Sequence, residues 1–150
     1  MGKTKFTDVH TKGLIQRPEW MHTDYLEYWL EDFVRDGSCL NMCSGLSQIG
    51  DVRVDIDPKC PASTMQGDLF KALETFRPES FDYVYCDPDF KCYNNGPNRI
   101  RWQFDLFKIC KKALITRRPK ITVNMPSKWH EYVIAEDSRP SFTIIRIDYK

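Results

Sequence analysis

Four consecutive residues, Asp87, Pro88, Asp89 and Phe90, follow the strand-like run Phe81–Cys86 and combine groups that can act on an amine. The Asp87 carboxylate and the Pro88 carbonyl can each accept a hydrogen bond from an amino N–H, which makes an aromatic amine a better nucleophile. Phe90 can stack on a flat ring. The alternative is an Asp-Pro turn at a strand end with no chemical role.

A second group of small and acidic residues follows the earlier strand-like runs. Glycine lets the backbone come close to a ligand, and a carboxylate at a strand end can accept two hydrogen bonds from a ribose diol. In open α/β sheets, ligands bind beyond the carboxyl ends of the strands. The candidate ligand-binding residues are Asn41, Cys43, Ser44, Gly45, Asp55, Asp57, Gly67, Asp68 and Leu69.

This ordered set, over about residues 39–90, resembles the first motifs of class I S-adenosylmethionine-dependent methyltransferases. The resemblance implies that S-adenosyl-L-methionine is the cofactor and that Gly45 and its neighbours line its methionine and adenosine. It also implies that Asp55, or alternatively Asp57, holds the ribose, while Asp68 and Leu69 read the adenine.

The segment from Asp87 to Phe90 resembles the Asp-Pro-Pro-Tyr/Phe motif of methyltransferases that modify exocyclic amino groups, mostly in nucleic acids. By this resemblance Asp87 and Pro88 accept the amine hydrogens and Phe90 stacks on a flipped-out base. The third position departs from the family, because Asp89 stands where the family has proline. Asp89 adds a second negative charge, and we expect it to contact the cofactor, accept a proton or mark a different substrate.

The order of predicted elements favours an α/β fold with a single-domain, Rossmann-like methyltransferase sheet over residues 1–150. We expect an irregular arm over 1–20, a helix over 24–36 that Asp24 and Glu27 cap, and a catalytic core over 38–150. Predicted strands cover 39–43, 52–56, 81–86 and 113–116, and runs at 129–136 and 142–149 predict a closing antiparallel hairpin. Asp68 is expected to cap a short helix, and Asn98 a longer one that reaches Leu114.

The connection between the first two predicted strands, residues 44–51, is too short for a normal crossover, which takes about a dozen residues or more. The first crossover helix is therefore expected to be shortened or absent. One face of the sheet would then be thinly covered. We expect either the helix at 24–36 or another subunit to cover it.

Composition narrows the possible partners. The net charge is only +1, yet the stretch from Arg99 to Lys120 holds eight basic residues and one acid, a pattern that can bind phosphates. Six irregularly spaced cysteines and three histidines predict reduced thiols and no metal site. The lack of a long apolar run predicts a cytoplasmic protein with no membrane contact. Candidate substrate contacts are Lys91, Tyr93, Arg99 and Arg101.

The leading hypothesis is an enzyme that N-methylates a nucleobase amino group in DNA or RNA, with adenine N6 ahead of cytosine N4. The chain has no room for a target-recognition domain, so we expect a second copy, a partner subunit or an unpaired base to complete the substrate site. One alternative is a cofactor-binding subunit with weak or no activity that stabilises a partner. Another is methylation of a protein or small-molecule amine.

Overall fold

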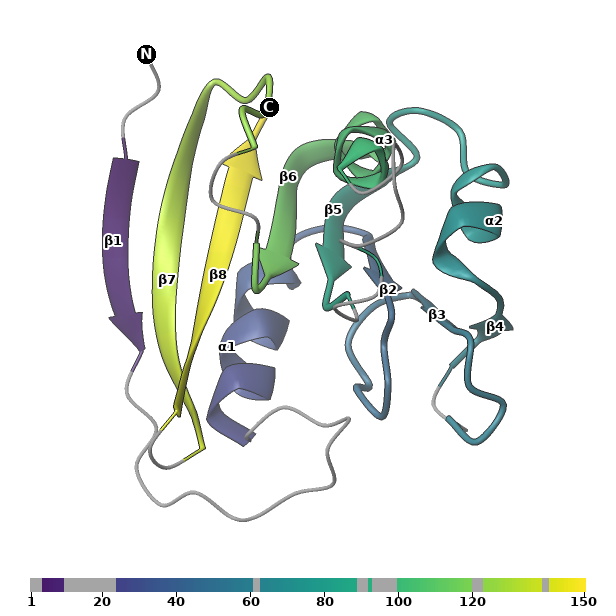
Figure 1. Ribbon diagram of the computed structural model, residues 1–150, viewed down its shortest axis with the longest axis horizontal. Helices are drawn as coiled ribbons and strands as arrows, with labels where there is room; N and C mark the ends of the chain where they lie inside the picture. Colours follow the sequence, from purple (N-terminus) through teal and green to yellow (C-terminus); the bar gives the residue numbers. More distant parts are fainter. Residues whose placement is uncertain are drawn as a thin grey trace.

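The computed structural model describes residues 4–9, 24–60, 63–88, 92, 100–119, 123–138 and 141–150. Within these ranges the chain forms eight strands and three helices (Figure 1). Their order is β1 (Thr4–Val9), α1 (Asp24–Val34), β2 (Cys39–Met42), β3 (Val52–Asp55), β4 (Met65–Gln66), α2 (Leu69–Leu73), β5 (Phe81–Cys86), α3 (Arg101–Ile109), β6 (Cys110–Arg117), β7 (Trp129–Ser138) and β8 (Ser141–Tyr149).

All eight strands belong to one sheet with the order β1-β7-β8-β6-β5-β2-β3-β4. Only β8 runs against its neighbours, and it lies between β6 and β7, so the last strand of the chain is internal to the sheet. The predicted α/β fold, mostly parallel with a C-terminal antiparallel pair, is confirmed. The order changes direction between β2 and β5, which is where such sheets bind ligands.

The N-terminal arm was expected to be irregular over 1–20, and this is wrong for its first part. Residues 4–9 form β1, which pairs in parallel with β7 from Thr4↔His130 to Val9↔Ala135. The partner strand lies more than a hundred residues away in sequence, so the local pattern could not indicate the pairing. Residues 10–23 of the arm lie outside the described residues.

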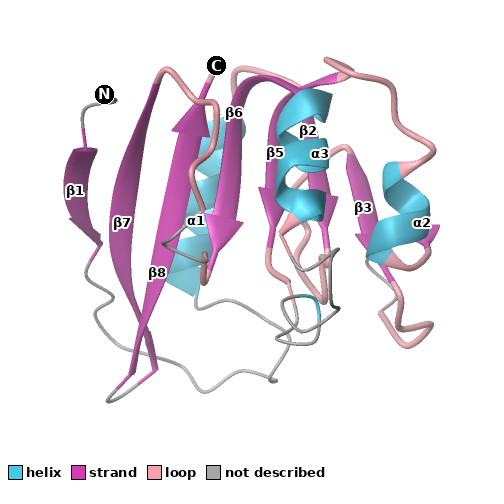
Figure 2. Cartoon of the chain, turned by 45° about the horizontal axis from the view of Figure 1, so that its top comes forward, coloured by secondary structure: helices cyan, strands magenta, loops and turns pink. Residues whose placement is uncertain are grey.

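Helices cover both faces of the sheet (Figure 2). On one face, Leu26 and Leu30 of α1 pack with Tyr85, Ile115 and Ile145 from the middle strands. On the other face, α2 and α3 cover a second apolar cluster. Its fully buried members include Leu40, Met42, Val84, Trp102, Leu106 and Leu114. The alternation of apolar side chains along each strand builds these two cores.

The connection from β2 to β3 contains no helix, as predicted. Instead, polar side chains of the sheet hold the loop against its α1 face: Asn41 Nδ2 donates to Ile49 O at 3.0 Å, and Arg53 Nη1 donates to Gly50 O at 2.8 Å. Helix α1 contributes Glu27, whose Oε1 accepts from Ser47 Oγ at 2.6 Å and from Gln48 N at 3.1 Å. The Glu27 side chain, expected to complete a helix cap, therefore anchors this loop to α1.

Helix α3 ends earlier than predicted. It stops at Ile109, and Cys110 takes extended dihedral angles and begins β6. Ile100 stands at the cap position without a side-chain hydrogen bond, and the expected cap Asn98 lies outside the described residues. The apolar spacing through Leu114 looked helical, but pairing of β6 with β5 buries Leu114 in the sheet instead.

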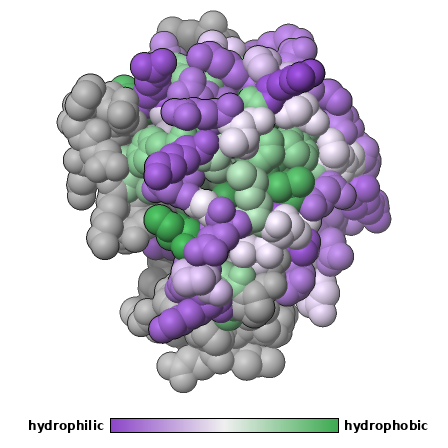
Figure 3. Space-filling model, turned by 90° about the vertical axis from the view of Figure 1, so that its right-hand side faces the viewer, coloured by the Kyte–Doolittle hydropathy of each residue, from purple (hydrophilic) through white to green (hydrophobic). Residues whose placement is uncertain are grey.

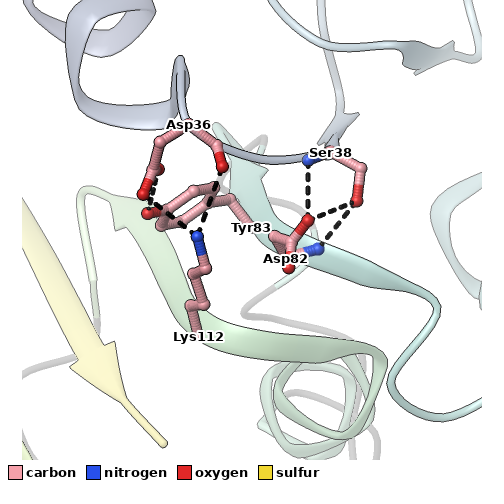
Figure 4. Close-up of polar contacts among 5 residues, drawn as sticks. All are labelled: Asp36, Ser38, Asp82, Tyr83 and Lys112. Atoms are coloured by element: carbon pink, nitrogen blue, oxygen red, sulfur yellow. Dashed lines mark hydrogen bonds and ion pairs between the residues drawn. The ribbon is translucent and has the colours of Figure 1, made fainter.

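A compact cluster of polar side chains lies where the parallel strands begin, which we call the amino-end edge of the sheet (Figure 4). Asp82 accepts from the backbone N–H and the hydroxyl of Ser38 at 2.9 and 3.0 Å. Asp36 accepts from the Tyr83 hydroxyl at 2.6 Å and from Lys112 Nζ at 3.0 Å. These hydrogen bonds tie the end of α1 to β5 and β6.

Candidate functional site

The described members of the predicted cofactor and transfer sites come together at the carboxyl ends of neighbouring strands. Met42 pairs with both Val54 and Cys86, and Cys86 pairs with Thr116, so β3, β2, β5 and β6 end side by side. Backbone hydrogen bonds continue the alignment past the strand ends, because Ser44 N donates to Val54 O and Asp87 N donates to Met42 O. The two groups of residues that the sequence singled out therefore share one edge.

The Ser44-Gly45 turn is shaped by unusual backbone angles. Cys43 has φ +58° and Gly45 has φ +55°, and only glycine adopts such values without cost. The non-glycine Cys43 is held there because the turn must leave β2 and fold back over the sheet. Left-handed backbone at a non-glycine residue often marks a ligand site.

Asp55, the predicted ribose acceptor, fixes this turn. Its Oδ2 accepts from Gly45 N at 2.7 Å and its Oδ1 accepts from Asp57 N at 2.9 Å. The carboxylate also has a hydrogen bond with the Cys60 thiol, and its remaining lone pairs can accept from another donor. Asp57, the alternate ribose residue, accepts locally from Lys59 N at 2.8 Å. Asp55 thus links the cofactor turn to the end of β3.

Two buried polar atoms at this edge have no partner among the described residues: Asn41 Oδ1 and Ser44 Oγ. Asn41 is fully buried and Ser44 is 4% exposed. Leaving a buried polar atom without a hydrogen bond costs about 1–3 kcal/mol, so such atoms call for an explanation. Both residues were predicted to contact the cofactor, and a polar ligand at the turn would supply the missing hydrogen bonds.

The predicted cofactor residues next to α2, Gly67, Asp68 and Leu69, differ in their contacts. Asp68 caps α2, as expected, since its Oδ1 accepts from Phe70 N at 2.9 Å and Lys71 N at 3.4 Å. Gly67 N donates to Asp55 O at 2.9 Å and its surroundings are open. Leu69 is only 5% exposed and packs in the core, so little of its side chain is accessible to an adenine ring. The first turn of α2 directs it towards the sheet.

The Asp87 carboxylate forms ion pairs with two arginines at the end of the neighbouring strand: Arg117 is the last residue of β6 and Arg118 follows it. Arg117 Nη1 lies 2.7 Å from Asp87 Oδ2, and Arg118 Nη2 lies 3.2 Å from Oδ1. Arg117 is also held by Thr143 of β8, to whose Oγ1 its Nε donates at 3.1 Å. Pro88 is buried beside them. From the sequence, both arginines were noted only as members of the basic stretch. The available signal was that they directly follow the predicted strand 113–116, as Asp87 directly follows the predicted strand 81–86.

Six predicted site residues remain. Asp89, Phe90, Lys91, Tyr93 and Arg99 lie outside the described residues. Arg101 is described: it begins α3 and is exposed, and its Nε lies 3.8 Å from Asp105 Oδ2.

All six cysteines are free thiols, and four of them are buried. Burial raises the pKa of Cys86 well above its usual range, and a hydrogen bond with Cys43 adds to the effect. Burial likewise raises the pKa of Cys39 and of Cys110 to about 12. These thiols are therefore protonated near neutral pH. In the described part of the chain, no three His, Cys, Asp or Glu side chains are arranged to hold a metal.

A separate groove of about 450 Å³ opens between α2 and α3. Its apolar lining includes Phe70, Leu73 and Phe76, and charged residues flank it. Figure 3 faces this side of the molecule and shows hydrophobic surface among hydrophilic side chains. Of the predicted site residues that the structure describes, only Arg101 lines the groove. The residues that were predicted to carry out chemistry therefore lie mainly at the carboxyl ends of the strands rather than in this groove.

None of the helices among the described residues has the length and apolarity needed to cross a membrane.

Comparison with known proteins identifies the fold. No family model matches the sequence, and no curated protein sequence matches it. A structure of WbdD, a bifunctional kinase-methyltransferase, aligns with 83% of this chain at 10% identity and a TM-score of 0.60. TrmN from Thermus thermophilus aligns with 85% of this chain at 15% identity and a TM-score of 0.53. A candidate methyltransferase from Escherichia coli, yhhF, aligns with 85% at 12% identity and a TM-score of 0.50.

The aligned chains differ in length from this one. The chain spans 40% of WbdD and 49% of TrmN, but 85% of yhhF. Such low identities establish the three-dimensional arrangement and nothing more. The chain has the Rossmann-like α/β fold of methyltransferase structures.

Proposed function

We propose that this chain is an S-adenosylmethionine-dependent methyltransferase whose cofactor binds at the Ser44-Gly45 turn and whose acceptor amine binds at Asp87. The observation that carries the proposal is the pair of buried atoms Asn41 Oδ1 and Ser44 Oγ, which have no partner among the described residues and lie at the same edge as Asp87. A core made only for stability would have little reason to keep two such atoms.

The residues at the turn fit the cofactor by their chemistry. Ser44 Oγ can donate or accept and Asn41 Oδ1 accepts, which suits the amino and carboxylate groups of a methionine moiety. The remaining lone pairs of Asp55 suit a ribose diol. Asp68 uses one carboxylate oxygen as the α2 cap, which leaves the other for an adenine amino group. This distribution supports Asp55 and Asp68 as adenosine contacts.

The transfer chemistry rests on Asp87 and Pro88. When bound, S-adenosylmethionine supplies an electrophilic methyl group; the amine nitrogen gains it, the sulfonium becomes a thioether, and the surplus proton leaves to solvent. The Asp87 carboxylate and the Pro88 carbonyl accept the amine hydrogens and so concentrate the nitrogen lone pair. Arg117 fixes the direction of the carboxylate through a 2.7 Å ion pair in a mostly buried setting.

A nucleobase amino group in RNA or DNA is the substrate that we propose, with adenine N6 ahead of cytosine N4. The Asp-Pro sequence at the strand end and the basic stretch beyond Arg99 support this choice. We propose that an unpaired substrate base, a second copy or a partner subunit completes base recognition. We place the enzyme in the cytoplasm.

A second candidate function is a cofactor-binding subunit with little or no activity. The observation that favours it is the occupied state of Asp87, because Arg117 and Arg118 engage both of its oxygens. If both ion pairs persisted, the Asp87 carboxylate would accept hydrogen bonds from an amine poorly.

Calorimetric titration with S-adenosylmethionine, followed by transfer of a tritiated methyl group to mixed RNA and DNA, separates these functions. For the enzyme we expect Asp87→Asn to bind the cofactor with an unchanged dissociation constant and to lose transfer by at least about 100-fold. Asp32→Asn is the matched control, because Asp32 is exposed on α1. Binding without transfer to any substrate by the wild-type chain would favour the subunit. Absence of binding would contradict both functions.

A further inference from the structure

Two cysteine side chains meet at the carboxyl ends of β2 and β5. Cys86 is the last residue of β5 and is fully buried, whereas Cys43 directly follows β2 and is half-buried. Both are free thiols, and a hydrogen bond joins one thiol to the other. Thiols in such contact can become a disulfide with little movement of the backbone.

The backbone of Cys43 explains why the two thiols meet. Met42 and Cys86 are partners in the parallel pairing of β2 with β5, and both pack in the apolar cluster under α2 and α3. Successive side chains of a strand alternate between its faces, so a regular continuation of β2 would direct Cys43 to the opposite face. Its φ of +58° ends the strand, and Cys43 packs against the same cluster as Cys86. The strained residue thus brings its thiol to that of Cys86.

The spacing of the two backbones suits a disulfide. Neighbouring strands lie about 4.8 Å apart and each residue rises about 3.3 Å, so Cα atoms one residue out of register are about 6 Å apart. Disulfides span Cα separations of about 4.4–6.8 Å. The backbone N–H of Asp87 donates to Met42 O at 3.3 Å, so the pairing of the two segments continues past Cys86 and holds them at this spacing.

The two thiols differ in their access to solvent. Half-buried Cys43 can be reached by a small oxidant, whereas the oxidant cannot reach Cys86 directly, because Cys86 is fully buried. Burial also raises the pKa of Cys86 well above its usual range, so this thiol keeps its proton near neutral pH. Oxidation is therefore expected to begin at Cys43 and to reach Cys86 only through Cys43.

We propose that Cys43 and Cys86 form a peroxide-sensitive dithiol that closes to a reversible disulfide. The Cys43 sulfur attacks one peroxide oxygen and the O–O bond breaks, which leaves a sulfenic acid on Cys43 and releases one water. The Cys86 sulfur then attacks the Cys43 sulfur, the S–O bond breaks, and the Cys86 proton leaves with that oxygen as a second water. Two thiols are oxidised and one peroxide is reduced to two waters. A small-molecule thiol reverses the reaction by exchange.

The disulfide is expected to act on the neighbouring turn, and this effect rests on the proposed function. Cys43 directly precedes Ser44 and Gly45, and Gly45 N donates to Asp55 of β3 at 2.7 Å. Strand β2 lies between β5 and β3, so a bond from Cys43 to Cys86 pulls the start of the turn away from Asp55. We expect the oxidised chain to bind S-adenosylmethionine about tenfold more weakly, the size of one hydrogen bond.

The test treats the reduced chain with hydrogen peroxide at neutral pH, alkylates the remaining thiols and maps the peptides by mass spectrometry. The wild type should lose two hydrogens and two alkylatable thiols, and one peptide pair should be joined through Cys43 and Cys86. Dithiothreitol should restore both thiols. Cys86→Ala should stop at a sulfenic acid on Cys43 that dimedone traps, and Cys43→Ser should leave Cys86 reduced. Cys110→Ala is the control and should match the wild type, because Cys110 is buried where β6 begins.

A disulfide from Cys43 to another cysteine, or oxidation of Cys43 beyond the sulfenic acid while Cys86 stays reduced, would overturn the inference. Calorimetry with S-adenosylmethionine on the reduced, oxidised and re-reduced wild type tests the effect on the turn. Equal affinity of all three forms would contradict that effect. A reduced chain that does not bind the cofactor would contradict the proposed function, while peptide mapping would still decide whether the disulfide forms.

Discussion

The two edges of the sheet are built from the same strands but satisfy their polar groups very differently. At the amino-end edge, Asp36 and Asp82 each accept two or more hydrogen bonds and join α1 to the strands. At the carboxyl-end edge, Asn41 Oδ1 and Ser44 Oγ are buried without partners among the described residues. The hydrogen bonds of the first edge come from the protein itself, and we propose that a ligand completes those of the second.

Backbone strain supports the same distinction. Cys43 and Arg118 carry positive φ next to buried strand ends at the carboxyl-end edge. Glu79 also has a positive φ, but it lies in an exposed turn near the other edge. Polar groups and strain that a fold would normally avoid are thus concentrated where chemistry is proposed. Stability and function are divided between the two ends of the strands.

The largest effect is expected at Gly37, which contacts the polar cluster of the amino-end edge. A Cβ at Gly37 would lie 2.6 Å from Asp82 Cβ, and Asp82 cannot move because Ser38 holds its carboxylate. We expect Gly37→Ala to lower the free energy of unfolding by about 3 kcal/mol in urea titrations. Gly67→Ala, at the carboxyl-end edge, has open space and should change it by less than about 0.5 kcal/mol. Equal losses would contradict the comparison.

Glu27 links α1 to the loop that replaces the first crossover helix. Glu27→Ala removes an acceptor for Ser47 Oγ and Gln48 N, so we expect a loss of about 2 kcal/mol in the free energy of unfolding. Cofactor affinity should fall as well, because the loop carries the Ser44-Gly45 turn. Glu31→Ala, one helical turn later on an exposed position, is the control. A result in which Glu27→Ala lost stability but kept full affinity would separate the loop from the cofactor site.

The amino-end edge should give the protein part of its acid sensitivity. Hydrogen bonds from the Ser38 backbone and hydroxyl lower the pKa of Asp82 below its ordinary value of 3.8. A lowered pKa in the folded state adds stability above the unfolded-state pKa, and this is lost as pH falls through the folded-state pKa. Asp82→Asn should therefore be less stable than the wild type at pH 7 and approach it in strong acid. Ser38→Ala, which keeps the backbone donor, should lie between them; a constant difference at every pH would contradict the assignment.

A smaller effect distinguishes two thiols at opposite ends of β2. Burial raises the pKa of Cys39 to about 12, whereas Cys43 is half-buried at the carboxyl-end edge. With an aromatic disulfide reagent at pH 8, Cys43 should react before Cys39, and S-adenosylmethionine should slow it. Cys43→Ser identifies the signal. Labelling of Cys39 first, or no protection by the cofactor, would remove Cys43 from the site.

The sequence was sufficient for the features that depend on local pattern. The C-terminal hairpin, the missing crossover helix and the Asp68 cap all follow from spacing and turn chemistry. The position of Asp87 at the end of β5 was also predictable, because a strand pattern ends at Cys86.

Features that depend on distant contacts were not predictable. The pairing of β1 with β7, the contact of Glu27 with Ser47 and the ion pairs of Asp87 with Arg117 and Arg118 join segments far apart in sequence. Local periodicity was also misleading at Leu114, where strand pairing prevailed over a helical pattern. Nothing in a single sequence states which apolar pattern tertiary pairing will select.

The central claim is that the unpaired groups at the carboxyl-end edge are kept for a cofactor, and Ser44→Ala tests it most directly. Calorimetric titration of the wild type with S-adenosylmethionine should give saturable binding of one molecule per chain, and Ser44→Ala should weaken it by about tenfold. The same variant should unfold with an equal or higher free energy, because it loses a buried hydroxyl that has no hydrogen-bond partner in the described part of the chain. Absence of binding by the wild type, or unchanged affinity in Ser44→Ala, would contradict the account.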